Sequence, residues 1–293
     1  MADTAPEEVL TELAQYSSFL QQLLYTRGIE TAVDAETFLK PLYAEGLHDP
    51  FLLHDMDVAV ERILKAIAGE QKIVVYSDYD CDGIPGGVVF HDFYKAIGYT
   101  NFINHIPHRH YEGFGLNVAA VEKLAEEGAK LIVTIDCGVT DVDAVAKANE
   151  LGVDVIITDH HQAKEKLPDA IAIVNPQIGD TYPFKGLCGA GVIFKVVQAL
   201  LEKGDFELKE GWEKWWLDMV AVATIADMVP LRGENRVLAT YGLQVLRKSR
   251  RPGLQQLLRK QKADQRYLTE DDIGFTIGPR INASSRMGTP EDA

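Results

Sequence analysis

The stretch KIVVYSDYDCDG, residues 72–83, runs from an apolar, β-branched segment directly into three closely spaced aspartates. The apolar part has the length of a buried strand, and Gly83 supplies the backbone freedom that a tight turn needs. Four similar segments recur, and several are followed by an amphipathic helical pattern: TNFINHI (100–106), KLIVTID (130–136), DVIITDH (154–160) and AIAIVNP (170–176). This alternation predicts an α/β fold, a doubly wound and mainly parallel five-stranded sheet with helices on both faces.

Outside the alternating segment the sequence pattern is helical. We expect residues 1–67 to form a helical N-terminal lead-in and residues 68–293 to form the main domain. Within that domain the α/β core covers 68–187 and a helical part covers 188–293. The sequence stops at TPEDA without a cap or packing signal, so we expect the chain to be the N-terminal portion of a longer protein.

The composition is that of a globular protein with an acidic excess. Hydrophobic residues make up 46% of the 293 residues, charged residues 25%, and the formal net charge is −15. No apolar run approaches the roughly 20 residues of a membrane-spanning helix, and the first ten residues lack the pattern of a signal peptide. We therefore expect a cytoplasmic protein without membrane association. Three cysteines in no metal-type spacing predict free thiols.

Two segments leave the nature of a partner open. The negative charge argues against nonspecific coating of nucleic acid, because that mode depends on counterion release from phosphates. Basic residues nevertheless concentrate in RKSRRPGLQQLLRKQKADQR, residues 247–266, which fits a solvated helix face or a local contact with phosphates. Trp212, Trp215 and Trp216 stand at helical spacing, which favours core packing over base stacking.

Acidic and imidazole side chains stand at the carboxyl ends of three predicted strands. In chain order they are Asp78, Asp80 and Asp82 after the first strand, Asp136 after the third, and Asp159, His160 and His161 after the fourth. Strand ends of a parallel sheet meet at one edge, so these groups converge. Carboxylates so close repel one another unless cations lie between them, and oxygen ligands joined by imidazole suit Mn²⁺ or Mg²⁺. Asp227, in TIADMVPL, follows an apolar helix and can complete the cluster.

Taken singly, each of these residues has an ordinary structural explanation. An aspartate after a strand is often a turn former or a helix cap, a histidine pair can lie in a surface loop, and Asp159 can orient a histidine instead of binding metal. An EF-hand is excluded, because GIPGGVV at 83–89 supplies neither further oxygen ligands nor a terminal Glu. Three separate strand ends delivering acids or imidazoles to one edge favour a metal site.

Four segments resemble, in order, the motifs of the DHH phosphoesterases: DYDCDG (78–83), IDCG (135–138), DHH (159–161) and ADMVPL (226–231). Four more resemble the RecJ-type exonucleases within that superfamily: RGIETAVDAETFLKP (27–41), LHDPFLLHDMDVAVERI (47–63), PHRHYEGFGL (107–116) and GPRINASSRMG (278–288). The resemblance runs from about Tyr25 to the end of the chain. It implies a metal-dependent phosphodiesterase that digests single-stranded DNA from the 5′ to the 3′ end in DNA repair and recombination.

The resemblance also implies roles for individual side chains. It makes six residues metal ligands for two Mn²⁺ or Mg²⁺ ions: Asp78, Asp80, Asp82, Asp136, His160 and Asp227. Asp136 bridges the two ions and forms the catalytic set with Asp159 and His161. Four residues are placed at the substrate: Arg109, Arg280, Asn282 and Arg286. For these four, a surface, carbonyl-binding or local-turn role remains an alternative.

The sequence departs from the family pattern at a few positions. Cys81 stands where the family has a small or apolar residue, and it either packs or adds a soft ligand. Pro85 fits the first turn of a helix, and Ser284 and Ser285 replace an Ala and a Gly, which alters the phosphate contacts there. Nothing matches the DHH-associated domain or the nucleic-acid-binding barrel of full-length RecJ-type proteins. We therefore expect metal binding but poor cleavage by this chain alone.

Two other functions remain open at this point. Other DHH enzymes hydrolyse pyrophosphate, oligoribonucleotides or cyclic dinucleotides, and some relatives are catalytically silent scaffolds in replication complexes. The complete set of aspartates and histidines argues against a silent scaffold. The expected partners are single-stranded nucleic acid, foremost DNA, and a single-strand-binding protein, with the chain itself a monomer.

Overall fold

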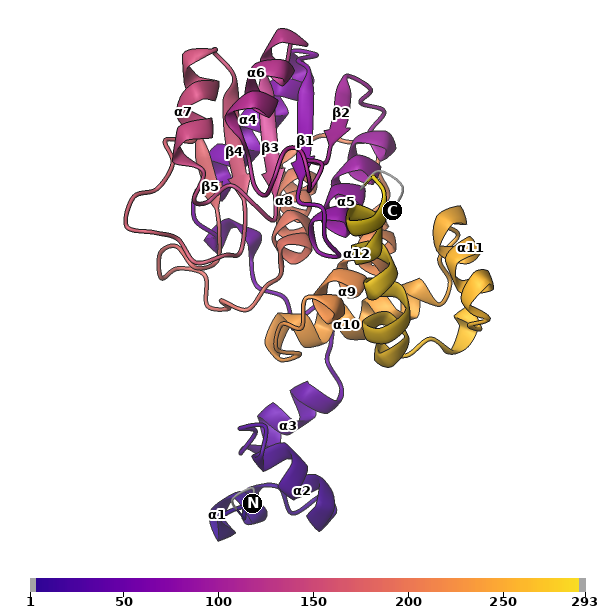
Figure 1. The fold of residues 1–293 in the computed structure, drawn as a ribbon. Coiled ribbons are helices and arrows are strands. Elements are labelled where there is room, and N and C mark those ends of the chain that lie inside the picture. Colours follow the sequence, from indigo (N-terminus) through magenta and orange to yellow (C-terminus); the bar gives the residue numbers. More distant parts are fainter. Residues whose placement is uncertain (1–3, 290–293) are drawn as a thin grey trace.

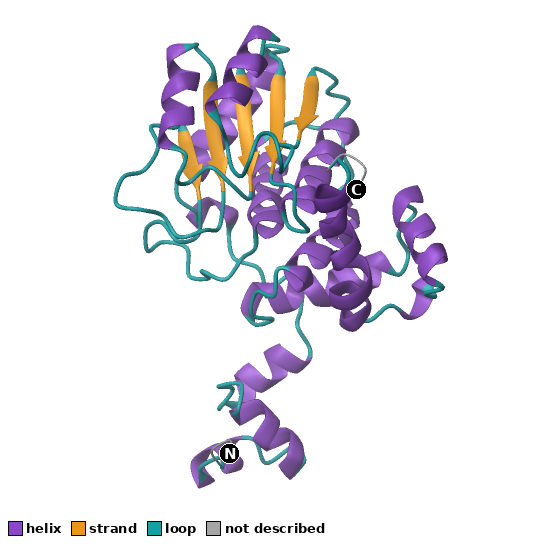
Figure 2. Ribbon diagram, in the orientation of Figure 1, coloured by secondary structure: helices purple, strands orange, loops and turns teal. Residues whose placement is uncertain are grey.

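Five parallel strands form the centre of the structure, a computed structural model that describes residues 4–289 (Figure 1, Figure 2). In chain order the strands are β1 (Ile73–Ser77), β2 (Phe102–His105), β3 (Leu131–Ile135), β4 (Asp154–Thr158) and β5 (Ala172–Val174). In space they follow the order β2-β1-β3-β4-β5, and every neighbouring pair is parallel. The chain passes outward from β1 to β2 and then crosses to β3 on the other side of β1. Ligands of such sheets bind beyond the carboxyl ends of the strands at this reversal.

Helices cover both faces of the sheet. The helices of the α/β core are α4 (Met56–Ala68), α5 (Gly83–Ala96), α6 (Val118–Glu126), α7 (Val142–Glu150) and α8 (Gly189–Lys203). Successive strand residues point to opposite faces: Val75 and Val133 pack with α4, α5 and α8, whereas Val74 and Ile132 pack with α6 and α7. Burial on both faces explains why the strands read as continuous apolar runs. The predicted doubly wound α/β fold is confirmed.

The C-terminal helical part packs against α5 and α8. Its helices are η2 (Trp212–Trp216), α9 (Leu217–Ala226), α10 (Gly233–Leu246), α11 (Pro252–Gln261), η3 (Gln265–Tyr267), the π-helix η4 (Asp272–Ile277) and α12 (Gly278–Met287). Helix α9 is buried from Leu217 to Thr224 between α5, α8 and α10. It is apolar on all sides, as a helix enclosed by other helices must be. The next residue after α9 is Asp227, so this enclosed helix holds a carboxylate in place.

The N-terminal residues form a small helical lobe that extends away from the sheet (Figure 1). Its helices are α1 (Glu7–Glu12), α2 (Ser18–Tyr25) and α3 (Ala32–Leu39), and η1 (Pro50–Leu52) follows in the connection to α4. Leu13, Leu24 and Ala35 form a core separate from that of the sheet. Helix α4, in contrast, packs on the sheet beside α8. The division into residues 1–67 and 68–293 stays a prediction, and α4 shows that sheet packing reaches into the first range.

A buried ion pair fastens the connection after this lobe to α8 and α10. Lys195 of α8 and Glu234 of α10 are fully buried, with Nζ and Oε1 2.5 Å apart. Lys195 also donates to the His48 carbonyl at 2.7 Å. Glu234 accepts hydrogen bonds from the His48 amide at 2.9 Å and from the Tyr182 hydroxyl. Each charge in this cluster therefore has partners within the chain.

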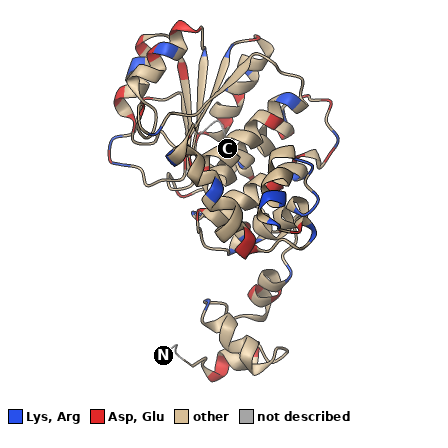
Figure 3. Ribbon diagram, turned by 45° about the vertical axis from the view of Figure 1, so that its right-hand side comes forward, with Lys and Arg blue, Asp and Glu red and all other residues tan. Residues whose placement is uncertain are grey.

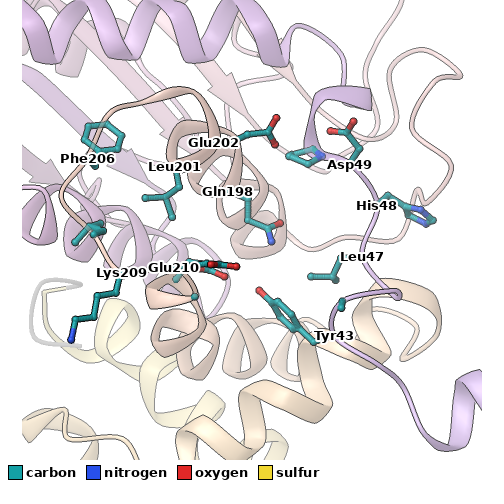
Figure 4. A pocket seen from close by; sticks show the side chains of 15 residues that line it. Tyr43, Leu47, His48, Asp49, Gln198, Leu201, Glu202, Phe206, Lys209 and Glu210 are labelled. Carbon is teal, nitrogen blue, oxygen red and sulfur yellow. The ribbon is translucent and has the colours of Figure 1, made fainter.

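A hollow of about 570 Å³ opens beside the same connection (Figure 4). Tyr43, Gln198 and Glu210 are among the residues that line it. None of the acidic or imidazole residues at the strand ends lines it, so it is separate from the site described below.

Two further expectations bear on the chain as a whole. In the part of the chain that the structure describes, no helix combines the length and the apolar character needed to cross a bilayer. Cys81, Cys137 and Cys188 are buried and unpaired, which confirms the expectation of free thiols.

Candidate metal centre

The turn after β1 carries three aspartates into the start of α5. The Asp80 carboxylate accepts hydrogen bonds from the amides of Asp82 and Gly83 at 2.9 and 3.1 Å, which fixes the turn. A Cβ at Gly83 would lie 2.5 Å from the Asp78 carbonyl oxygen. Gly83 does not have a positive φ, so glycine is required here by close backbone approach. The turn therefore holds Asp78 and Asp82 buried and close together.

Asp136 follows β3 in a left-handed backbone conformation, with φ of 62°. Aspartate and asparagine tolerate this region better than most residues, and such strained positions cluster at functional sites. The Asp136 amide donates to the Thr158 carbonyl at 2.9 Å, which keeps the residue in line with β4. A Cβ at Gly189, the first residue of α8, would lie 2.5 Å from the Asp136 Cβ. Asp136 is thus enclosed between the sheet edge and the start of α8.

The two histidines after β4 play different structural parts. His160 Nε2 lies 3.1 Å from Asp136 Oδ1, 3.6 Å from Asp82 Oδ2 and 3.9 Å from Asp227 Oδ2. The Asp159 carboxylate bonds His161 Nδ1 at 2.7 Å. Asp159 therefore orients His161, an arrangement typical of carboxylates behind functional histidines.

Hydrogen bonding also sets the pKa values of this pair. Burial alone would raise the pKa of Asp159, but bonds from the His161 side chain and from the backbone amides of His161 and Val139 outweigh it, and the pKa is lowered. The hydrogen bond to Asp159 raises the pKa of His161. The pair therefore favours an ionised carboxylate beside a protonated imidazole.

The structure brings the candidate ligands into three overlapping groups, in each of which the ligand atoms lie within 4.8 Å of one another. The groups are Asp78, Asp80 and Asp136; Asp82, His160 and Asp227; and Asp136, His160 and His161. Asp136 and His160 each belong to two groups. All six residues predicted to bind metal are included, and the Asp136 carboxylate, which has two oxygens, could serve two neighbouring ions.

Unpartnered buried atoms show that this cluster fits divalent cations. Among the described residues, Asp78 Oδ1, Asp136 Oδ1 and His160 Nε2 are buried without a hydrogen-bond partner, although buried polar atoms almost always have one. Burial, with repulsion from Asp80, raises the pKa of Asp78 to about 7. Burial also raises the pKa of Asp136 well above its usual range and that of Asp227 to about 6. Oxygen and imidazole ligands that lack partners and resist ionisation without a cation match Mn²⁺ or Mg²⁺.

Sequence reasoning missed the contribution of α8. The amides of Gly189 and Ala190 donate to the two carboxylate oxygens of Asp82 at 2.6 and 2.7 Å. These are orphan donors of the helix N-terminus, where the helix dipole also favours a negative charge. Burial still raises the pKa of Asp82, against the opposing effects of His160 and these amides. The glycines of CGAG at 188–191, at the start of a predicted helix, were the available signal.

Comparison with known proteins agrees with this geometry. The model of the DHH family, N-terminal domain, matches residues 72–224, which is more than half of the chain. The chain belongs to the DHH family. Residues 72–224 contain five of the six predicted metal ligands of the DHH centre, and Asp227 lies three residues beyond.

The chain is also similar to RecJ exonucleases, as its sequence predicted. It is 42% identical over 286 residues to the single-stranded-DNA-specific exonuclease RecJ of Bacillus subtilis, covering 97% of this chain and 35% of that protein. It is 34% identical over 286 residues to that of Escherichia coli, covering 94% and 48%. The chain thus spans between about a third and a half of the length of these relatives.

Solved structures show the same similarity. A crystal structure of exonuclease RecJ bound to manganese matches with a TM-score of 0.74 and 33% identity, over 86% of this chain and 61% of that one. The RecJ of Thermus thermophilus in complex with Mn²⁺ matches with a TM-score of 0.77 and 29% identity, over 97% and 39%.

The structure places the four predicted substrate residues in different surroundings. The Arg109 guanidinium lies 5.0 Å from the centre of the Tyr79 ring. Arg280 is exposed and donates to the Thr276 carbonyl at 2.8 Å, which is the carbonyl-binding alternative. The Asn282 side chain accepts from the Cys81 amide at 2.8 Å and so ties α12 to the aspartate turn. Arg286 is exposed. Their roles at the substrate stay predictions.

The aromatic pair of Tyr79 and Phe114 also borders the candidate metal centre. The Phe114 ring lies 6.4 Å from the His161 ring and 6.4 Å from the Tyr79 ring, edge to face in both cases. Phe114 is 57% exposed. The segment at 107–116 therefore presents an aromatic face and Arg109 beside the candidate ligands.

Proposed function

We propose that this chain is the catalytic portion of a metal-dependent phosphodiesterase that digests single-stranded DNA from its 5′ end, in repair and recombination. The carrying observation is the set of overlapping ligand groups at the switch between β1 and β3, with three buried atoms left without partners. The names of the relatives, single-stranded-DNA-specific exonucleases, support the substrate class. The 5′ polarity rests on the family resemblance of the sequence.

The ligand groups divide naturally between two cations. Asp78, Asp80 and Asp136 would hold one, and Asp82, His160 and Asp227 the other, with Asp136 shared. Divalent cations, when bound, polarise the phosphoryl oxygens and lower the pKa of a coordinated water. We propose Mn²⁺ or Mg²⁺, because the ligands are carboxylates and imidazole and no thiolate joins the groups.

The remaining side chains bind and orient the phosphodiester. His161, whose pKa the hydrogen bond to Asp159 raises, would in its protonated form place a positive charge beside a non-bridging oxygen. Arg109, Arg280 and Arg286 would contact the terminal phosphate, as charged planar donors suit phosphate oxygens. Asn282, which holds the Cys81 amide, would keep the aspartate turn in place.

Hydrolysis assays test this proposal directly. The chain is incubated with Mn²⁺ and 5′-phosphorylated single-stranded DNA, beside cyclic di-AMP and pyrophosphate. We expect slow, metal-dependent loss of the DNA. Asp136→Asn should reduce it by about a thousandfold or more, because several kcal/mol of charge stabilisation at the phosphate would be lost. Asn is chosen because it tolerates the left-handed backbone at this position. Asp143→Asn, an exposed residue of α7, is the matched control.

The outcomes separate the competing functions. Hydrolysis of the dinucleotide or of pyrophosphate with the DNA intact would replace the exonuclease by another DHH phosphoesterase. Binding of Mn²⁺ without hydrolysis of any substrate would favour a catalytically silent scaffold. Full activity of Asp136→Asn would remove the basis of the metal proposal.

We also propose a cellular location, a partner and an oligomeric state. Three buried free cysteines suit the reducing cytoplasm, and a single-stranded substrate makes a single-strand-binding protein the natural partner. We propose a monomer, which gel filtration combined with light scattering tests.

A further inference from the structure

Three adjoining hollows form a groove on the helical part of the chain, apart from the metal centre. Their volumes are about 530, 310 and 310 Å³. Lys248 lines all three, Trp215 and Val245 line the first and second, and Gln244 lines the second and third. We call this surface the basic-aromatic groove and define it by Trp212, Lys214, Trp215, Arg247, Lys248 and Arg250. None of the candidate metal ligands lines it.

Two tryptophan rings are exposed in this groove. Trp212 is 42% exposed and Trp215 54%, whereas Trp216 is 4% exposed and packs 6.3 Å from the Phe93 ring. Core packing is thus confirmed for Trp216 and wrong for the other two. The segment is the 3₁₀-helix η2, in which residues three apart share a face. Trp212 and Trp215 therefore lie together on the outer face.

The charge of the groove is opposite to that of the chain. Six basic and two acidic side chains line the three hollows, a formal difference of +4, in a chain of net charge −15. The two acidic residues, Asp92 and Asp218, both pair with Arg251, at 2.7 and 2.8 Å. Lys248 and Arg250 are exposed and have no acidic partner among the described residues. In Figure 3, Lys and Arg positions recur on the helices below the sheet.

We propose that the basic-aromatic groove binds a single strand of nucleic acid, with bases stacked on Trp212 and Trp215 and phosphates at Lys248, Arg250 and Arg247. Exposed aromatic faces beside uncompensated cations are what sequence-tolerant single-strand binding requires. Stacking accepts any base, and the cations displace the counterions of the backbone. Double-stranded nucleic acid keeps its bases stacked on one another and cannot offer them to the rings.

The groove is joined to the metal centre by two rigid helices. Helix α5 follows Asp82 at the metal centre and carries Asp92 in the groove, and α9 runs from Asp218 in the groove to Asp227 at the metal centre. Nine or ten helical residues span about 14 Å. The two sites are therefore distinct but lie at opposite ends of the same helices. The inference rests on the proposed function only for the choice of DNA as the probe.

Binding is tested with an oligothymidylate bearing a 5′-hydroxyl group, in EDTA so that metal-dependent contacts are absent. All three tryptophans of the chain belong to η2, so quenching of intrinsic fluorescence reports directly on the groove. We expect quenching in the wild type. By anisotropy of a labelled oligothymidylate, Trp212→Leu/Trp215→Leu should bind about tenfold more weakly.

A charge-reversal pair isolates the phosphate contacts. Lys248→Glu/Arg250→Glu should weaken binding about tenfold or more and flatten its dependence on salt, because fewer counterions are released. Lys123→Glu/Lys130→Glu carries the same change of charge at exposed positions near α6 and is the control. It should bind within about twofold of the wild type, since exposed charges farther away than a Debye length are screened.

Two results would overturn the proposal. One is oligothymidylate binding that neither groove variant alters. The other is quenching by an acidic, aromatic peptide but not by oligothymidylate, which would make the groove a protein-docking surface. Hydrolysis is measured separately, so that a wild-type chain that hydrolyses DNA but shows no binding of oligothymidylate in EDTA contradicts only this inference. Groove binding without any hydrolysis contradicts only the proposed function.

Discussion

Two clusters of buried charged residues contact helix α8, and they differ in whether the chain satisfies them. Lys195 and Glu234 form a pair whose remaining capacity is taken by His48 and Tyr182. At the strand edge, the charged and imidazole groups beside Asp78 and Asp136 are aspartates and histidines, and both residues keep a buried oxygen without a hydrogen-bond partner. The Lys195–Glu234 cluster, in which each charge has a partner, stabilises the fold, and we call it the closed cluster. The aspartates and histidines at the strand edge form what we call the open cluster, which requires a ligand from outside the chain.

The directions of the pKa shifts agree with this contrast. Burial lowers the pKa of Lys195, and Glu234 opposes that shift by favouring the charged form. At the strand edge, burial and the neighbouring aspartates Asp82 and Asp80 act together to raise the pKa of Asp136. A bound cation would lower the pKa of Asp136, because it supplies the positive charge that the chain does not.

The largest expected effect on stability comes from removing one charge of the closed cluster. Lys195→Met should lower the free energy of unfolding by about 3–5 kcal/mol, because it leaves the buried Glu234 charge uncompensated. Urea denaturation of the metal-free chain measures it. Lys203→Met, at the exposed end of the same helix, should cost less than about 1 kcal/mol. Equal losses in the two variants would show that the buried pair is not a stabilising feature.

Neutralising an aspartate of the open cluster should raise the stability of the metal-free chain, which is the opposite of the effect of Lys195→Met. Asp136→Asn removes a buried, repelled carboxylate and should stabilise the chain in EDTA by about 1–2 kcal/mol. With saturating Mn²⁺ the wild type should be the more stable, because ligand binding stabilises only the state that binds. Thermal unfolding with EDTA and with Mn²⁺ gives both comparisons. Destabilisation by the same amount in both conditions would mark Asp136 as purely structural.

The close approach of α8 to the open cluster can be disturbed without changing any charge. A Cβ at Gly189 would meet the Asp136 carboxylate at 2.7 Å, whereas one at Gly191 would make only ordinary contact with Leu187 at 3.4 Å. Gly189→Ala should weaken Mn²⁺ binding about tenfold, and Gly191→Ala by less than about twofold. Titration calorimetry measures both. Equal affinities would mean that the start of α8 does not shape the site.

The smallest expected effect is a dependence of stability on pH. Asp78, with its pKa raised to about 7, keeps a proton in the folded metal-free chain that the unfolded chain has lost. The contribution of Asp78 to the stability of the folded chain is therefore fully present below the unfolded pKa near 4, and it is lost as pH rises through about 7. We expect the difference in unfolding free energy between Asp78→Asn and the wild type to grow in favour of the variant by about 1 kcal/mol between pH 6 and pH 7. A difference that shrinks as pH rises would contradict the assigned shift.

Local patterns in the sequence were enough to predict the sheet and the meeting point of the ligands. Apolar runs such as 130–136 give the strands, and the side of the sheet at which parallel strands end follows from their direction. Asp136 and His160 therefore could be placed together although they are 24 residues apart in the chain.

What the sequence did not reveal depends on tertiary contacts and on helix type. The bonds from Gly189 and Ala190 to Asp82 join segments more than 100 residues apart, and Lys195 has the same local pattern as a solvated lysine. The exposed Trp212 was misjudged because its spacing was taken as α-helical, whereas η2 is a 3₁₀-helix.

Calorimetric titration of the metal-free chain with Mn²⁺ tests the central claim most directly. We predict two ions bound per chain, with both weakened by Asp136→Asn and neither by Asp143→Asn. No bound ion, or two ions held equally well by Asp136→Asn, would contradict the conclusion that the open cluster at the strand edge is a metal centre.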